Sequence, residues 1–510
     1  MGLGAFDIGV FVAFILAIVA VSLFKSRRET TSEAYFLAGR GLVWPLIGLS
    51  IVAANLSTEQ FVGMAGQSAG AVGLAVTNWQ LSGAVAIIIV AFVFLPRFLR
   101  AGIYTMPEYL EYRYNTWARG IMAIYTVIIY VLVTSATVLY SGGLTLQTIF
   151  DMPLGQAIWL IGFVAAAYTV WGGLKAVAWA DLVQGAGLVL GGFITLFLGL
   201  KAVGGWSAFA EHNADRLHMI LPADHPHLPW TALLLGMWIP NFYYCGLNQF
   251  IMQRTLAAKS LRQGQLGIIL ASGLWVLVPF FVVMPGIIAF QLYGDSMSSS
   301  DQAYPTLIRN LVPAGVRGFM LAAIAGAVIS SLASMLNSAS TVFTMDLYNR
   351  YLHPGASQRT LVFMGRGVTL LFVVLSCLIA PFLGNERFGG IFNYIQEFQG
   401  YISPGILAAF VFGFAVKQAP RAAGAVALLI SAPVYGFLHW QFNDIAYLNR
   451  MAITLFVVFL VMGVLTLVFP NPAPRPLPVR MEVNRRIDPV AAAAATAVLT
   501  AIAAFYWYFW

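Results

Sequence analysis

Side-chain hydroxyls are concentrated in one apolar stretch of the chain. Ser330, Ser331, Ser334 and Ser338 recur at helical spacing within the small-residue run 322–340, so at least three hydroxyls can share one face of a helix. Two neighbouring hydroxyls, joined by backbone carbonyls from an interrupted helix, would form an uncharged oxygen cage that suits a small hard cation. The alternative is close helix packing through small residues, which is common in membranes.

A polar run interrupts a second apolar stretch, which extends from Ile47 to Gly70. Five of the six residues from Asn55 to Gln60 are polar. Polar residues within a membrane span are costly and face protein or a water-filled cavity. The run therefore predicts a break that exposes backbone carbonyls and two half-helix ends. A continuous helix whose polar groups bond to neighbouring helices is the alternative.

Pro240 and Asn241 lie in the middle of a third apolar stretch, at about 230–251. Proline removes a backbone donor and frees a carbonyl, so the pair predicts a second interruption. The two predicted breaks lie five spans apart, which is the offset expected for two five-helix halves of inverted topology.

The remaining reactive side chains form no catalytic constellation. Gly66–Gly70 matches the hydrolase nucleophile elbow but lies in an apolar helix and not after a strand. Cys245 and Cys377 occur in apolar stretches without disulfide or zinc-ligand spacing. The histidine-containing connection 203–229 is proline-rich and is expected to be a solvated loop, with a metal site as the alternative. We therefore expect no enzyme activity and no catalytic residue.

The composition of the chain indicates which structural elements hold these residues in place. Of 510 residues, 60% are hydrophobic and 9% are charged, whereas a soluble domain is about 25% charged. The chain is therefore expected to be an all-α integral membrane protein in contact with the lipid bilayer. Apolar runs long enough to cross a bilayer lie at about 5–24, 43–70, 74–98, 118–150, 154–171, 178–202, 230–251, 266–292, 314–348, 361–384, 388–416, 421–440, 450–469 and 489–510.

The net charge of +8 raises the question of a nucleic-acid partner. With the N-terminus outside, 21 of the 27 Lys and Arg residues, Arg254 among them, fall in the cytoplasmic connections. Basic residues favour cytoplasmic loops, so about fourteen spans with both termini outside are expected. This asymmetry explains the charge without nucleic acid, and no obligate protein partner is evident.

Asp181 lies at the predicted cytoplasmic start of the sixth span. One interpretation is a buried acid on a cation route, and the other is a helix N-terminal carboxylate that interacts favourably with the helix dipole.

Several long segments resemble one family. They are AYFLAGRGLVWPLIGLSIVAANLSTEQFVGM, GIYTMPEYLEYRY, YTVWGGLKAVAWADLVQG, NQFIMQRTLAAKS and ISSLASMLNSASTVFTMDLY. In order and position they are similar to the sodium:solute symporter family, in its sodium/glucose cotransporter branch of the bacterial sodium/galactose type. The resemblance runs from about residue 34 to 417 and continues more weakly to the C-terminus.

The resemblance implies a LeuT-type fold with a five-plus-five inverted repeat and sodium-driven alternating access, in a bacterial-type inner (plasma) membrane. The transport core would occupy 43–417. An extra helix and loop at 1–42 would precede it, and additional helices at 418–510 would follow.

The same resemblance implies one sodium site and an exit route for the ion through Asp181. Its ligands would be the carbonyls of Ala53, Leu56 and Ala327 and the hydroxyls of Ser330 and Ser331. A second sodium requires another hydroxyl near the serine pair. That position is Ala333 here, so one sodium per solute is expected.

A sugar site is implied in the same way. Amides that would bond sugar hydroxyls are Gln60, Asn241 and Gln396. Tyr244 would stack beneath the ring as the inner gate, with Asn55 as its anchor. Outer-gate positions are Met64, Phe392 and Trp79, the last replacing a usual tyrosine.

Three positions depart from the resembling sugar cotransporters: Gln80 replaces a glutamate, Trp275 a lysine and Gly83 a serine. These changes remove an acid and a base, so a neutral pocket is expected. Amides and aromatic faces suit a polyhydroxylated ligand, and a carboxylate would lack a cation. The prediction is a sodium-coupled importer of a neutral sugar or polyol. Alternatives are a symporter of another small solute, such as a carboxylate, and a non-transporting sensor.

Overall fold

The computed structural model describes residues 4–25, 31–57, 59–150, 152–297, 299–384, 391–472, 477–480 and 487–510. Within these ranges regular structure is helical, apart from one isolated parallel bridge between Leu42 and Ala258. The expected all-α class is confirmed.

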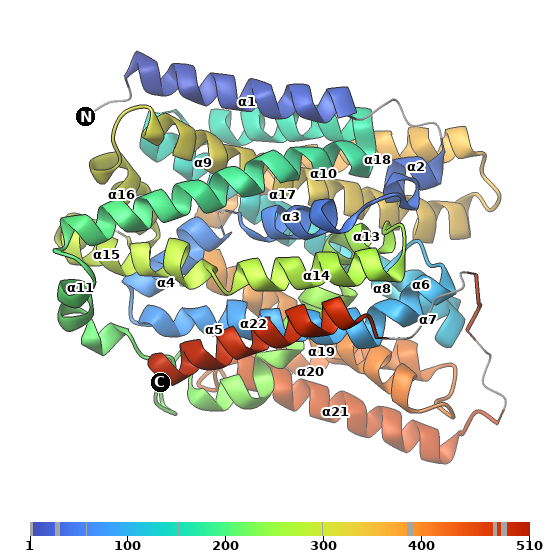
Figure 1. Cartoon of the computed structure of the whole chain (residues 1–510). Coiled ribbons are helices and arrows are strands. Elements are labelled where there is room, and N and C mark those ends of the chain that lie inside the picture. The colour runs from blue at the N-terminus through green and yellow to red at the C-terminus, as the bar shows by residue number, and fades with distance from the viewer. Residues whose placement is uncertain are drawn as a thin grey trace.

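The described residues form twenty-two α-helices, most of which are labelled in Figure 1. They are α1 Ala5–Lys25, α2 Ser32–Leu37, α3 Trp44–Asn55, α4 Ala65–Ala69, α5 Asn78–Ile89, α6 Leu95–Ala101, α7 Met106–Arg113, α8 Thr116–Ile128, α9 Ala136–Phe150, α10 Leu154–Ala202, α11 Trp206–His212, α12 Trp238–Phe242, α13 Gln249–Leu256, α14 Leu261–Trp275, α15 Met284–Tyr293, α16 Ala303–Leu311, α17 Val316–Val342, α18 Gln358–Ile379, α19 Ile391–Ala415, α20 Ala423–Gln441, α21 Tyr447–Val468 and α22 Pro489–Tyr508.

Short π-helical turns join several of these helices into longer rods. Val90–Phe94 joins α5 to α6, Ile129–Ser135 joins α8 to α9, and Pro279–Val283 precedes α15. In the described chain nine such rods or helices are long and apolar enough to cross a membrane, and two bent pairs raise the number to eleven. The other three expected spans correspond to the shorter apolar helices Ala5–Ile18, Leu154–Ala167 and Ala232–Leu247.

The helices lie side by side in one bundle, and the two termini lie at the same end of it (Figure 1). Helices α6 and α7, which carry Arg97, Arg100 and Arg113, lie at the opposite end. The basic residues of these two helices therefore lie at the end of the bundle opposite both termini (Figure 1).

Arginine side chains tie the segments at this basic end together. Arg40 donates hydrogen bonds to the carbonyls of Leu256 (3.2 Å), Gly102 (3.1 Å) and Ile103 (3.1 Å). Nearby, Glu111 accepts hydrogen bonds from Arg119 (2.7 Å) and Arg350 (3.1 Å). Burial acts to raise the pKa of Glu111, but the hydrogen bonds from the two arginines outweigh it and hold the pKa below its usual value. The carboxylate therefore stays charged and keeps both arginines in place.

Helix α10 joins two of the expected spans, 154–171 and 178–202, through a break at Gly173. This residue has φ 55° and ψ −151°, a conformation that is essentially restricted to glycine. A Cβ there would lie 2.4 Å from the Tyr35 carbonyl oxygen. The second half of α10 carries Asp181, which is fully buried in the bundle.

Candidate functional site

The second expected span is broken where the sequence predicts. Helix α3 ends at Asn55, Leu56 leaves helical geometry at φ −75° and ψ 84°, and helical turns resume at Glu59. The two segments are bent by 51°. Thr58 lies outside the described residues. The break is confirmed, and the alternative of a continuous helix is wrong.

The break releases two particular carbonyls. In a continuous helix the N–H groups of Ser57 and Gln60 would bond to the carbonyls four residues earlier, those of Ala53 and Leu56. Instead the Ser57 N–H donates to the Asn55 carbonyl (2.9 Å), and the Gln60 N–H donates to the Ser57 carbonyl (3.1 Å). Ala53 and Leu56, which lose these helical partners, are residues whose carbonyls the family resemblance assigns to sodium.

Helix α17 supplies the expected hydroxyls beside this break. It is continuous through the serine run, and Ala327, Ser330 and Ser331 are all fully buried. The Ser331 hydroxyl donates to the Ala54 carbonyl (3.1 Å), at the last turn of α3. Residues 327, 330 and 331 share one helix face, so the structure brings the serine pair to the end of α3. Ala333 offers no hydroxyl.

A buried ion pair lies next to the serine pair. Asp181 accepts hydrogen bonds from the Ser330 and Ser50 hydroxyls and from Arg254 Nη2 (2.9 Å). The Arg254 guanidinium also donates to Ser50 Oγ and Ser334 Oγ, each at 2.6 Å. Helices α3, α10, α13 and α17 are therefore joined through one pair of charges.

Two expectations are corrected by this pair. The sequence placed Arg254 in a basic connection, whereas the structure buries it fully within α13. Asp181 is not a helix N-terminal carboxylate, because it lies more than two turns beyond the break at Gly173. It is buried, as the first interpretation held.

The seventh expected span is also broken, although not at Pro240. Pro240 and Asn241 lie in α12, in the middle of the helical stretch Ala232–Leu247, which continues through them. The chain becomes extended at Asn248 (φ −79°, ψ 124°). The Asn248 side chain accepts the N–H of Phe250 (3.1 Å) and so caps the start of α13. The predicted position of the second break was wrong by about two turns.

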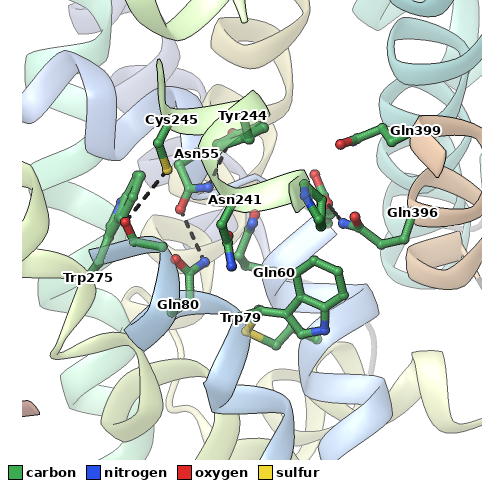
Figure 2. Close-up of a pocket in the computed structure, with 14 residues that line it drawn as sticks. Asn55, Gln60, Trp79, Gln80, Asn241, Tyr244, Cys245, Trp275, Gln396 and Gln399 are labelled. Carbon is green, nitrogen blue, oxygen red and sulfur yellow. Dashed lines mark hydrogen bonds between the residues drawn. The ribbon is translucent and has the colours of Figure 1, made fainter. Parts of the chain in front are cut away.

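A small cavity lies between the first break, the seventh span, α5 and α19. Figure 2 shows Gln396 and Gln399 on one side of it and Trp275 and Cys245 on the other. Its expected members are Asn55, Gln60, Met64, Trp79, Gln80, Gly83, Asn241, Tyr244, Trp275 and Gln396. The Phe392 side chain lies outside the described ones.

Amide side chains in the cavity donate hydrogen bonds to neighbouring side chains, and two of them form a short chain with Tyr244. Gln80 Nε2 donates to Asn55 Oδ1, and Asn55 Nδ2 donates to the Tyr244 hydroxyl, each at 3.2 Å. Asn241 Nδ2 donates to Ser82 Oγ (2.7 Å). Asn55 is thus bonded to Tyr244, as expected of its anchor, and Gln80 extends the chain.

Two of the departures from the resembling cotransporters are neighbours. A Cβ added at Gly83 would lie 3.7 Å from the six-membered ring of Trp275 and 3.3 Å from Asn241 Oδ1. A serine hydroxyl at position 83 would need further room in the same space. Gly83 therefore leaves the space that the larger Trp275 indole occupies, and the two changes compensate each other in volume.

Four further residues line the cavity that the sequence did not assign to it: Glu59, Pro240, Cys245 and Gln399. Glu59 matters most, because it adds a carboxyl group to a pocket in which amides and aromatic rings were expected. It accepts a long hydrogen bond from Gln396 Nε2 (3.5 Å). Its place in the polar run next to Gln60 was the available signal. Elsewhere, no group of His, Cys, Asp and Glu among the described residues could hold a metal ion.

Comparisons with known proteins agree with this geometry. Residues 35–431 match the model of the sodium:solute symporter family. The chain is 40% identical to a sodium/glucose cotransporter of Vibrio parahaemolyticus, over 91% of this chain and 90% of the relative. It is 34% identical to human sodium/myo-inositol cotransporter 2, over 86% of this chain and 70% of the relative.

Solved structures show the fold. A sodium-coupled sialic acid symporter in a substrate-bound outward-open state matches with a TM-score of 0.83 at 22% identity, covering 93% of this chain and 99% of the other. A nucleobase-cation-symport-1 family transporter in a closed conformation gives 0.58 at 13% identity, with the same coverage. The fold is LeuT-like.

The ion pair generates a prediction about stability. Asp181→Asn leaves the Arg254 charge buried without its counterion, and breaking one side of a buried pair costs about 3 to 5 kcal/mol. We expect a marked fall in the thermal denaturation midpoint of the purified protein. Arg254→Met combined with Asp181→Leu removes both charges and should be less damaging than Asp181→Asn. If Asp181→Asn melts at the wild-type temperature, the pair does not brace the bundle.

Proposed function

The chain belongs to the sodium:solute symporter family and is a sodium-coupled solute symporter, not an enzyme; we propose that it imports a neutral sugar or polyol by alternating access. The observation that carries this proposal is that one helix break borders both sites. The carbonyls of Ala53 and Leu56 lose their helical partners on either side of Ala54 and Asn55. The Ser331 hydroxyl of α17 bonds to the Ala54 carbonyl, while Asn55 and Gln60 line the cavity. Ion and solute would therefore act on the same few residues.

The solute class is supported by the cavity and by the relatives. Amides and aromatic rings dominate its lining, and such groups bond hydroxyls and cover C–H surfaces. The relatives named above are cotransporters of glucose and of myo-inositol. In our proposal Gln60, Asn241 and Gln396 bond solute hydroxyls and Tyr244 stacks beneath the ring as the inner gate. Met64, Trp79 and Phe392 form the outer gate.

The proposed topology has about fourteen spans in a bacterial-type inner membrane, with both termini outside. A five-plus-five inverted repeat over 43–417 would form the core, with extra helices at 1–42 and 418–510. Breaks in both the second and the seventh span support the repeat, since such breaks recur at corresponding positions of inverted halves.

The proposed coupling ion is one sodium, held by the carbonyls of Ala53, Leu56 and Ala327 and the hydroxyls of Ser330 and Ser331, with Asp181 on its exit route. One charge gains about 2.3 kcal/mol per 100 mV of membrane potential, and a tenfold concentration ratio adds about 1.4 kcal/mol. Together these terms support a roughly several-hundred-fold accumulation of solute.

Removing either proposed hydroxyl ligand should weaken the sodium site. We expect Ser330→Ala and Ser331→Ala each to raise the sodium concentration for half-maximal uptake about tenfold, or about 1.4 kcal/mol. Uptake in proteoliposomes at varied sodium is the measurement. Ser376→Ala, which removes a buried hydroxyl of α18 that bonds to the Val131 carbonyl, is the matched control. Unchanged sodium dependence in both variants would contradict the assignment of Ser330 and Ser331 as sodium ligands.

The coupling ratio follows from Ala333, which has no hydroxyl at the position where a second sodium would require one. We expect one sodium to enter with each solute. The reversal potential of solute-dependent flux in sealed vesicles measures this ratio, and a value near two would contradict the single site.

Solute affinity should depend on the cavity amides. Gln60→Ala, Asn241→Ala and Gln396→Ala each remove a neutral hydrogen bond worth about 0.5 to 1.5 kcal/mol, so KM should rise about two- to tenfold. Tyr244→Phe should retain substantial binding, because ring stacking remains. Competition against uptake of labelled sugar tests the solute class. If a carboxylated solute competes better than every neutral sugar and polyol, the proposed solute class is wrong and a carboxylate symporter is the better description.

A further inference from the structure

Helix α19 is bent, and its first segment carries two of the amides that line the cavity. The segments Tyr394–Gly400 and Ser403–Ala415 lie at 48° to each other. Gln396 and Gln399 line the cavity from the first of them (Figure 2). Residues three apart share a helix face, so Glu397, which lies between them, points away from that face. The orientation of the first segment therefore decides where both amides lie.

Two features weaken the helical hydrogen bonding at the bend. Pro404 has no N–H to donate to the Gly400 carbonyl. Ser431 Oγ of α20 accepts the Gly405 N–H (3.0 Å) and donates to the Tyr401 carbonyl (3.0 Å), two groups that pair with each other in a regular helix. A side chain inserted in this way kinks a helix. Contacts outside α19 are therefore needed to fix the first segment.

An ion pair supplies such a contact on the side of the segment that faces away from the cavity. Arg450 Nη2 of α21 donates to both carboxylate oxygens of Glu397, each at 3.1 Å. The Tyr435 hydroxyl of α20 also donates to Glu397 (2.8 Å), and His439 Nδ1 lies 2.8 Å from the same oxygen. Arg450 Nη1 donates to Asn443 Oδ1 (3.1 Å). The Arg450 side chain is 4% exposed, so water has little access to replace the carboxylate.

Helix α21, which packs against α19 (Figure 1), contacts a second wall of the cavity with the same face. Tyr447 and Arg450 are three residues apart and therefore neighbours on α21. The Tyr447 ring stacks on Trp79, with the ring centroids 6.5 Å apart and the planes 9° apart, and Trp79 lines the cavity. A helix outside the proposed 43–417 core is thus in contact with the solute cavity through α5 and through α19.

We propose that the Glu397–Arg450 pair positions the first segment of α19, and that Arg450 thereby affects solute binding through Gln396 and Gln399. Arg450 is a positioning residue, since it is not among the residues that line the cavity. The inference rests on the proposed function in one respect, the binding of solute by the cavity amides.

Sodium-driven uptake of labelled glucose or myo-inositol in proteoliposomes tests this role. Arg450→Gln and Glu397→Gln should each raise the solute KM about three- to tenfold, as for the loss of one neutral hydrogen bond to the solute. The maximal rate and the sodium concentration for half-maximal uptake should stay within about twofold of the wild type, because the proposed sodium site lies on other helices. Arg450→Lys keeps the charge without the two-pronged geometry and should recover part of the affinity.

The double variant Glu397→Gln with Arg450→Gln should raise KM no further than either single variant, because all three lose the same pair. It leaves no unpaired buried charge, so it keeps the test available where a single variant does not fold. Arg262→Gln removes an exposed ion pair with Asp488, at the start of α22, and is the matched control. It should match the wild type.

Hydrogen exchange of the purified full-length protein reports on the segment without transport. Amides of residues 394–403 should exchange at least about threefold faster in the double variant than in the wild type, because the segment opens more readily. Amides of residues 361–376 in α18 should be unchanged, and Arg262→Gln should exchange as the wild type does.

Three results would overturn the inference: equal exchange of residues 394–403 in the double variant and the wild type, a solute KM in the double variant within about twofold of the wild-type value, or a lower maximal rate at unchanged KM. If the wild type shows no sodium-driven uptake of either solute while the exchange difference is present, the proposed function is contradicted and the positioning of α19 by the pair is supported.

Discussion

Within a bilayer every backbone carbonyl needs a partner from the protein, a bound ion or enclosed water, because lipid offers none. The break after Asn55 deprives the carbonyls of Ala53 and Leu56 of their helical hydrogen bonds. Neighbouring groups must therefore supply other partners for them. Continuous α17 does so by presenting hydroxyls at the break, and the Ser331 hydroxyl already bonds to the neighbouring Ala54 carbonyl. A cation held between freed carbonyls and hydroxyls would complete the arrangement, and this is the physical basis of the proposed coupling.

The buried Asp181–Arg254 pair keeps these parts in register. Each charge is compensated by the other and by serine hydroxyls of α3 and α17, so the cost of burying two ions is offset by a complete set of hydrogen bonds. The pair touches Ser330, one of the proposed sodium ligands. Movement of α13 relative to α17 would therefore alter the proposed ion site, and the break at Asn248 divides α13 from the part of the same span that lines the solute cavity.

The sequence was sufficient for features set by local chemistry. Apolar runs located the helices, and the polar run at Asn55–Gln60 located the first break, because both depend on neighbouring residues. Features set by distant contacts were missed or misplaced. Arg254 looked like a loop charge because its partner Asp181 is 73 residues away. Pro240 looked like the second break, whereas the capping side chain of Asn248 decides it. Glu59 was overlooked as part of a polar run, since only the folded chain brings it against Gln396, 337 residues further on.

The central claim is that a sodium gradient drives solute uptake, and it is tested most directly by placing the purified protein in sealed proteoliposomes with labelled glucose or myo-inositol outside. With an inward sodium gradient and a negative interior potential, the account predicts transient accumulation of the label above its outside concentration. Replacing sodium by choline should reduce uptake to the level of protein-free vesicles. Equal uptake in sodium and choline, or equilibration without accumulation under the gradient, would contradict the account.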